Sequence, residues 1–239
     1  MKKILCTLAV LLMGLGAQAW VLDDFQSDLI DSSLIDRKFQ AKISEVGFKL
    51  LNANAIDKRV AFHYKKSDVV NAGAYIATQR RIVIYRGFLK FMDSDDELAS
   101  ILAHEISHIQ DSHDGVMRGL LYPLTNTFTT MQYEYKADKR AIDYMVKAGY
   151  NPLAFITIMN KAAGQHRYDV PLFSSHPLTS RRLMSAYEYI YTKYPSYLAS
   201  SEYKNNIYYQ NFLLVSQKDR AKLQQKSKLQ NVNYKQEVK

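Results

Sequence analysis

Apolar side chains recur along the chain with two spacings, which are typical of helices and of strands. Helical spacing is present in five segments: residues 23–54, 95–109, 127–148, 153–163 and 179–194. Residues 60–64 alternate apolar with polar or small side chains, as a strand does. Residues 71–85 have the pattern of a hairpin with a turn at Gln79 and Arg80. We therefore predict several helices and a small sheet.

The N-terminus has the pattern of a secretory signal peptide. A basic start is followed by an apolar run from Ile4 to Leu15 and by a small-residue cleavage site that ends at Ala19. A permanent membrane anchor is the alternative, but it needs about 20 apolar residues. We expect residues 1–19 to be removed after Ala19 and the protein to be periplasmic or secreted. The only cysteine, Cys6, lies in this segment, so disulfides and cysteine chemistry are excluded from the rest.

The net charge of the 239-residue chain is +9, and part of the excess lies near the C-terminus. It is compatible with acidic partners or with peripheral association with an anionic membrane, although a solvated surface explains it more simply. No nucleic-acid-binding motif accompanies the charge, so we expect no nucleic-acid partner. Residues 20–200 are long enough for one domain, and residues 201–239 are expected to form a helical or disordered extension.

Residues 104–108 are the most informative segment of the chain, and they read His104-Glu105-Ile106-Ser107-His108. The apolar side chains around them fall on one broad arc of a helix, so residues four apart share a face. Two imidazoles at this spacing can bind one Zn²⁺, with Glu105 beside them as a general base. The alternative is a surface helix that carries two histidines by chance.

A catalytic zinc site needs a third protein ligand, because it usually has three and keeps one position for water. Glu134 and Asp138 lie one turn apart on the predicted helix 127–148. Glu134 could reach the metal while Asp138 accepts a hydrogen bond from a ligating imidazole. The alternative is an exposed helix on which two like charges repel each other. A nearby cation explains this spacing better.

Three motifs in this order resemble the M48 family of zinc metallopeptidases. The first runs from Asn71-Ala72 through the acidic start at residues 95–97 to the histidine motif, and the second from Glu134 through Asp138 to Asn151-Pro152. The third is the segment of residues 175–182, which includes His176-Pro177 and Arg182. The resemblance covers about residues 30–195. Ser107 departs from it, because the family has glycine there, but serine is also small.

The resemblance implies an α+β fold that is mainly α-helical, a zincin-like domain of the gluzincin type with a small β-sheet. It makes His104, His108 and Glu134 the ligands of one Zn²⁺ per chain and Glu105 the base. We expect His176 near the metal, as an oxyanion donor or an occluding fourth ligand. A loop histidine beside a proline is the alternative. Arg182 is expected to pair with Asp138 or Glu134 rather than with substrate.

The family also suggests where a substrate would lie. Asn71 resembles a residue at the rim of the family's cleft. Ile82 and Ile84 belong to a strand that precedes the motif helix, where zincins place the edge strand that binds extended peptides. The alternative is that this strand simply completes the core sheet.

These observations predict an exported bacterial zinc endopeptidase that hydrolyses unfolded or damaged envelope proteins, a role in protein quality control. Its partners would be protein or peptide substrates, and the sequence leaves the oligomeric state open. The alternative is a catalytically restrained zinc-binding protein that acts as a chaperone or a protein-binding module.

Overall fold

The computed structural model describes residues 34–75, 80–89, 92–111, 127–164, 179–199 and 202–237. The chain divides into two compact units, residues 1–39 and 40–239, and the fold and site lie in the second. The expected signal peptide, residues 1–19, lies outside the described residues. No helix in the described ranges combines the length and hydropathy that crossing a membrane requires.

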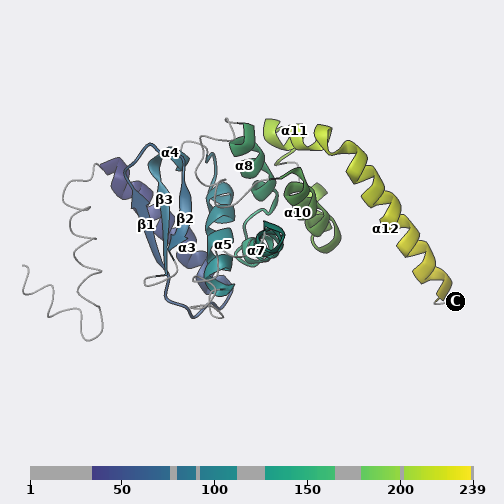
Figure 1. Cartoon of the computed structure of the whole chain (residues 1–239), viewed down its shortest axis with the longest axis horizontal. Coiled ribbons are helices and arrows are strands. Elements are labelled where there is room, and N and C mark those ends of the chain that lie inside the picture. The colour runs from purple at the N-terminus through teal and green to yellow at the C-terminus, as the bar shows by residue number, and fades with distance from the viewer. Residues whose placement is uncertain are drawn as a thin grey trace, which may run out of the picture. The chain divides into compact units, whose positions relative to one another are not determined.

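The predicted helices and small sheet are both present, which confirms the α+β class (Figure 1). The three strands are β1 (Ala61–Lys65), β2 (Ala72–Tyr75) and β3 (Arg81–Tyr85). The first helices are α3 (Leu34–Ala53), α4 (Arg86–Leu89), α5 (Asp95–Asp111) and α7 (Thr127–Lys147). They are followed by α8 (Leu153–Gly164), α10 (Ser180–Lys193), a 3₁₀ turn (Pro195–Ala199), α11 (Ile207–Val215) and α12 (Gln217–Glu237).

The sheet has the order β1-β3-β2, with β1 parallel and β2 antiparallel to β3. The β2–β3 pairing confirms the predicted hairpin. The expectation that Ile82 and Ile84 belong to an edge strand is wrong, because β3 has a partner on each side and both side chains are fully buried. The alternative, in which this strand completes the core sheet, is correct.

The two outer strands differ in whether a side chain hydrogen-bonds to the main chain at the free edge. Gln40 on α3 donates a hydrogen bond to the Phe62 carbonyl at 2.8 Å and accepts one from the Tyr64 N–H at 2.7 Å. Its amide thus satisfies the main chain along the outer edge of β1. The strand β2 lies at the other edge and contacts α5.

Helix α5 lies between the sheet and the helices α7 and α8 (Figure 1). Every residue from Glu97 to Ser107 is buried, as is Ile109. Such a helix must satisfy its terminal backbone groups within the protein. The Ser94 hydroxyl accepts from the Glu97 N–H at 3.2 Å, and Lys58 donates to the carbonyls of Ile109 and Gln110, both at 2.9 Å. The helix is therefore capped at both ends.

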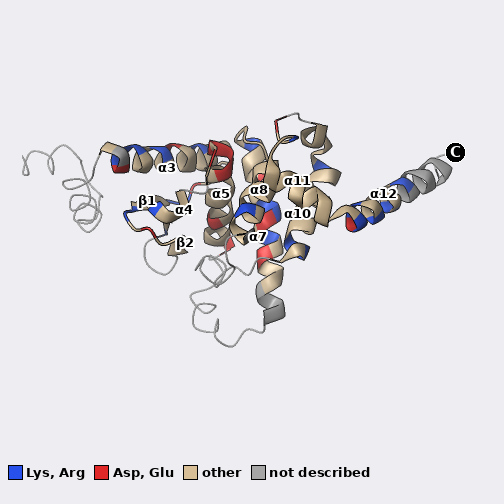
Figure 2. Cartoon of the chain, turned by 90° about the horizontal axis from the view of Figure 1, so that it is seen from above, with Lys and Arg blue, Asp and Glu red and all other residues tan. Residues whose placement is uncertain are grey.

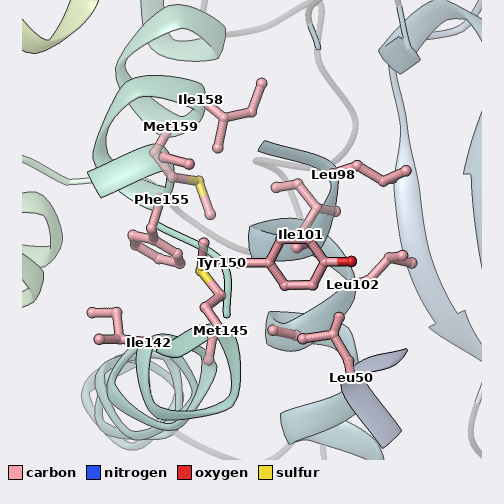
Figure 3. Close-up of a cluster of buried hydrophobic side chains, with 14 of the residues drawn as sticks. Leu50, Leu98, Ile101, Leu102, Ile142, Met145, Tyr150, Phe155, Ile158 and Met159 are labelled. Carbon is pink, nitrogen blue, oxygen red and sulfur yellow. The ribbon is translucent and has the colours of Figure 1, made fainter. Parts of the chain in front are cut away.

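The hydrophobic core fills the space between α5, α7 and α8. Figure 3 shows Leu98 and Leu102 on one side of Tyr150 and Phe155 on the other. The Phe155 ring also lies 6.4 Å from the ring of His104. The core therefore packs directly against the histidine motif and restricts how its first imidazole can move.

A buried ionic cluster fastens the start of α5 to α8. Lys161 donates to Glu97 at 2.8 Å and to the exposed Asp93 at 2.7 Å, and Thr157 donates to Glu97 at 3.0 Å. Burial lowers the pKa of Lys161, but hydrogen bonds to Asp93 and Glu97 outweigh it and raise the pKa above its ordinary value. Lys161 therefore stays charged in a buried position.

We predict that Lys161→Met destabilises the fold by about 3 kcal/mol, because it leaves the buried Glu97 carboxylate without its cation. Chemical denaturation measures the change in unfolding free energy. Adding Glu97→Gln removes the uncompensated charge and should recover part of the loss. Lys147→Met, on an exposed lysine, is the control and should change stability little. A loss for Lys161→Met no larger than for the control would contradict this account.

Candidate metal centre

Three helices bring the candidate residues together. Helix α5 carries His104, Glu105 and His108, α7 carries Glu134 and Asp138, and α10 carries Arg182. Five of these side chains are buried, whereas His108 keeps 17% of its side chain exposed. The helical spacing of four residues explains why the histidines share a face, as it does for Glu134 and Asp138. The one partly exposed nitrogen ligand marks the side from which solvent reaches the site.

The three expected ligands meet in one cluster. The Nε2 atoms of His104 and His108 are 3.1 Å apart. The Nε2 of His104 lies 3.4 Å from one oxygen of Glu134, and that of His108 lies 3.4 Å from the other. Zinc bound tetrahedrally, with bonds of about 2.0–2.1 Å, requires its ligand atoms to be about 3.3 Å apart. The separations and the donor set of two imidazoles and a carboxylate fit such an ion, so these residues could hold a metal.

Asp138 and Arg182 contact the side chains of the expected ligands and restrict their positions. The Nδ1 atom of His104 lies 3.1 Å from Asp138, which leaves Nε2 directed toward the other ligands. Arg182 donates to both oxygens of Asp138, at 2.8 and 2.6 Å, and its Nη1 lies 2.9 Å from Glu134. These contacts agree with the expected pairing of Arg182 with the carboxylates and with Asp138 as the partner of an imidazole.

The electrostatics of the centre favour a positive charge at His104. Burial lowers the pKa of His104, but hydrogen bonds to Asp138 and Glu134 outweigh it and raise the pKa to about 9. Burial raises the pKa of Asp138, but hydrogen bonds from Arg182 and His104 outweigh it and lower the pKa. The two carboxylates thus stabilise a positive charge at this position, which a bound divalent cation would also supply.

Glu105 lies beside His104 in sequence and is buried, with 1% of its surface exposed. A carboxylate in such a place can accept a proton from a reacting group, which is the chemistry of a general base.

The other predicted site residues fall in different places. Asn71 lies immediately before β2, and its carbonyl accepts from the Tyr85 N–H at 3.1 Å. Ile82 and Ile84 point into the core from the middle strand. His176 lies outside the described residues, so its expected place near the metal stays a prediction.

Two supporting residues were not found from the sequence. Lys58 caps the C-terminal end of α5 from a loop that is distant in the sequence. No local sequence pattern predicts such a contact. Arg140 donates to the Ser107 carbonyl at 3.2 Å and to Asp111 at 2.8 Å. Its place one turn beyond Lys136 on α7 indicates a basic helix face, and that pattern could have predicted an acidic partner.

Comparison with known proteins agrees with this geometry. The sequence is similar to curated proteins named beta-barrel assembly-enhancing protease. The protein of Escherichia coli (strain K12) is 25% identical over 199 residues, which cover 67% of this chain and 40% of that protein. The protein of Yersinia pestis is 27% identical over 183 residues, which cover 60% and 37%. The chain thus spans about 40% of the length of the curated relatives it matches.

The family comparison is more extensive. The sequence model described as "Peptidase family M48" matches residues 35–132 and 114–190. The matched ranges include all three motifs that carried the resemblance and every residue of the candidate metal centre. Because the match covers more than half of the sequence and the motif residues meet at one place in the fold, the chain belongs to peptidase family M48.

Proposed function

We propose that the chain is a zinc-dependent endopeptidase that hydrolyses peptide bonds in unfolded or damaged envelope proteins. The single observation that carries this proposal is the cluster of His104, His108 and Glu134, whose ligand atoms lie close enough together to hold one metal ion. The export-type N-terminal segment and the relatives named for β-barrel assembly support an envelope substrate. We infer a periplasmic or secreted location on the same grounds.

In this mechanism Glu105 moves the protons. Zinc, when bound, lowers the pKa of a water molecule and polarises the scissile carbonyl. Glu105 takes a proton from the attacking water and passes it to the leaving amine. Asp138 keeps His104 in the tautomer whose Nε2 is free to act as a ligand. Arg182 contacts both carboxylates and lowers the pKa of Asp138, so it holds them in place. We assign His176 as an oxyanion donor or an occluding ligand, as the family resemblance implies.

The correction to the sheet order changes where we place the substrate. Because β3 is the middle strand, an extended peptide would pair with the outer edge of β2, which contacts α5. Asn71 stands at the start of this strand. Gly73 has open space where a side chain would begin, so no described residue covers this face of β2. The outer edge of β1 is less suitable, because Gln40 already satisfies its main chain.

We predict that Glu105→Gln lowers the turnover of casein by about 10²–10⁴-fold, because it removes the general base. Zinc content, measured by mass spectrometry, should stay at one ion per chain. Glu188→Gln on α10 is the matched control and should cleave like the parent. Equal turnover by parent and Glu105→Gln would overturn the mechanism. Full zinc loading without turnover, even in His176→Ala, would instead favour the chaperone-like alternative.

We also predict that Asp138→Asn weakens zinc binding by about 10–100-fold, because the amide orients His104 less well and removes a charge beside Arg182. Competition with a chromogenic chelator measures the affinity. Asp143→Asn is the matched control on α7, because Asp143 contacts Tyr189, Tyr194 and Lys193 rather than the metal centre. Similar zinc affinities for the two variants would contradict the role given to Asp138.

A further inference from the structure

Helix α11 exposes an apolar face that the proteolytic chemistry does not use. Tyr209 and Phe212 are buried, and the helix contacts α8. On the opposite side Ile207 and Leu214 are 62% and 71% exposed, with the polar Gln210 and Asn211 between them. Val215 follows Leu214 at the end of the helix and is 83% exposed, at the edge of the groove that Phe212 also lines. Aliphatic side chains exposed together, rather than singly, indicate an interaction surface.

Lysines follow this apolar face on α12. Helix α11 ends at Ser216, whose N–H donates to the Phe212 carbonyl, and the Arg220 N–H of α12 donates to the Ser216 carbonyl, both at 2.9 Å. Lys218 and Lys222 lie in the first turns of α12, directly after the exposed end of α11. We call the exposed aliphatic side chains Ile207, Leu214 and Val215, together with these lysines, the α11–α12 face.

The charge of this region has one predominant sign. Residues 217–228 have five basic side chains, and Asp219 is the single acidic one. Lys222 and Lys226 also line a groove of about 890 Å³ between α10 and α12, together with Lys139 and Arg181 and with the acidic Glu188 and Asp219. Figure 2 shows several blue residues and one red residue in the first half of α12. The face is therefore complementary to an anionic partner.

We propose that the α11–α12 face docks onto an anionic lipid bilayer. Ile207, Leu214 and Val215 would enter the interface between headgroups and acyl chains, and the lysines would contact lipid phosphates. The composition separates this partner from an acidic protein. Binding hot spots on proteins are rich in Trp, Tyr and Arg, and interface cores are depleted in Lys. Leucine and valine next to lysines are instead typical of a membrane surface.

The length and polarity of α12 limit how deep this contact goes. Its mean hydropathy is low, and the side chains of residues 217–228 are exposed except for Leu223 and the partly buried Arg220 and Ser227. Such a helix has no apolar face to insert into a bilayer. Only the aliphatic side chains of α11 would enter the bilayer, so the attachment is peripheral and reversible. This inference does not depend on the metal centre.

Vesicle co-sedimentation of the full chain tests the proposal. We expect binding to vesicles of phosphatidylethanolamine and phosphatidylglycerol, little binding to phosphatidylcholine, and weaker binding at high salt. Each lysine near an anionic surface strengthens binding about fivefold, so Lys218→Gln with Lys222→Gln should weaken it about 25-fold. Leu214→Ser with Val215→Ser should weaken it about tenfold. Casein turnover in solution should stay at the parental value in both variants.

Control variants test whether vesicle binding depends on the α11–α12 face or only on the total charge and hydropathy of the protein. Lys49→Gln with Lys147→Gln removes the same charge elsewhere, and Val69→Ser removes an aliphatic side chain that is 46% exposed. Both should bind vesicles like the parent. The proposal is overturned by α11–α12 variants that bind as tightly as the parent, by controls that weaken binding equally, or by no preference for anionic lipid.

A fluorescent label at residue 215 tests the proposal with a protein that still binds vesicles. Val215→Cys in a Cys6→Ser background can carry a polarity-sensitive dye, because Cys6 is the only cysteine. Its emission should shift to the blue with phosphatidylglycerol vesicles and stay constant with phosphatidylcholine. The same dye at Val69→Cys should not respond to either. A label at residue 215 that reports water in the presence of anionic vesicles would refute the insertion of α11.

Discussion

The buried guanidinium of Arg182 is the interaction on which the arrangement of the metal centre depends. It contacts Asp138 and Glu134 at once, and all three side chains are nearly inaccessible to solvent. Two carboxylates one turn apart on α7 would repel each other in a region of low dielectric. The planar, permanently charged guanidinium of Arg182 lies between the two carboxylates. It offsets their repulsion and restricts the positions of both groups. It also joins α10 to α7 at the place where the ligands meet.

The helix that carries the histidines is held just as firmly along its length. Its N-terminal turn is capped by Ser94 and joined to α8 by the buried pair of Glu97 and Lys161. Its C-terminal carbonyls accept hydrogen bonds from Lys58. Because α5 is buried on almost every side, its side chains have one packing arrangement and little freedom. Rigid placement of ligands and base is what preorganised catalysis requires.

The remainder of the fold separates two kinds of surface. On the side of the sheet, β2 offers main-chain groups next to α5, whereas Gln40 closes the corresponding edge of β1. On the side of the C-terminal helices, α11 combines a buried aromatic face with an exposed aliphatic one, and α12 follows with lysines. Our two proposals therefore use different parts of one domain, β2 for an extended peptide and the α11–α12 face for an anionic bilayer.

The sequence by itself determined the elements and most of the metal centre, because those features depend on local spacing. Helical periodicity placed His104 and His108 on one face, and Glu134 and Asp138 on another, without any tertiary information. The hairpin of residues 71–85 could be predicted because its two strands and its turn are adjacent in the sequence. The family resemblance added the functional roles that spacing alone does not supply.

Only the tertiary structure decided the contacts between distant segments. The parallel pairing of β1 with β3 makes β3 the middle strand. The alternation of apolar and polar residues in a strand does not indicate which strand pairs with it. In the same way, the pairing of Arg182 with both carboxylates and the capping of α5 by Lys58 depend on helices and loops that meet only after folding. Periodicity determines which side of an element is buried, but packing determines what covers it.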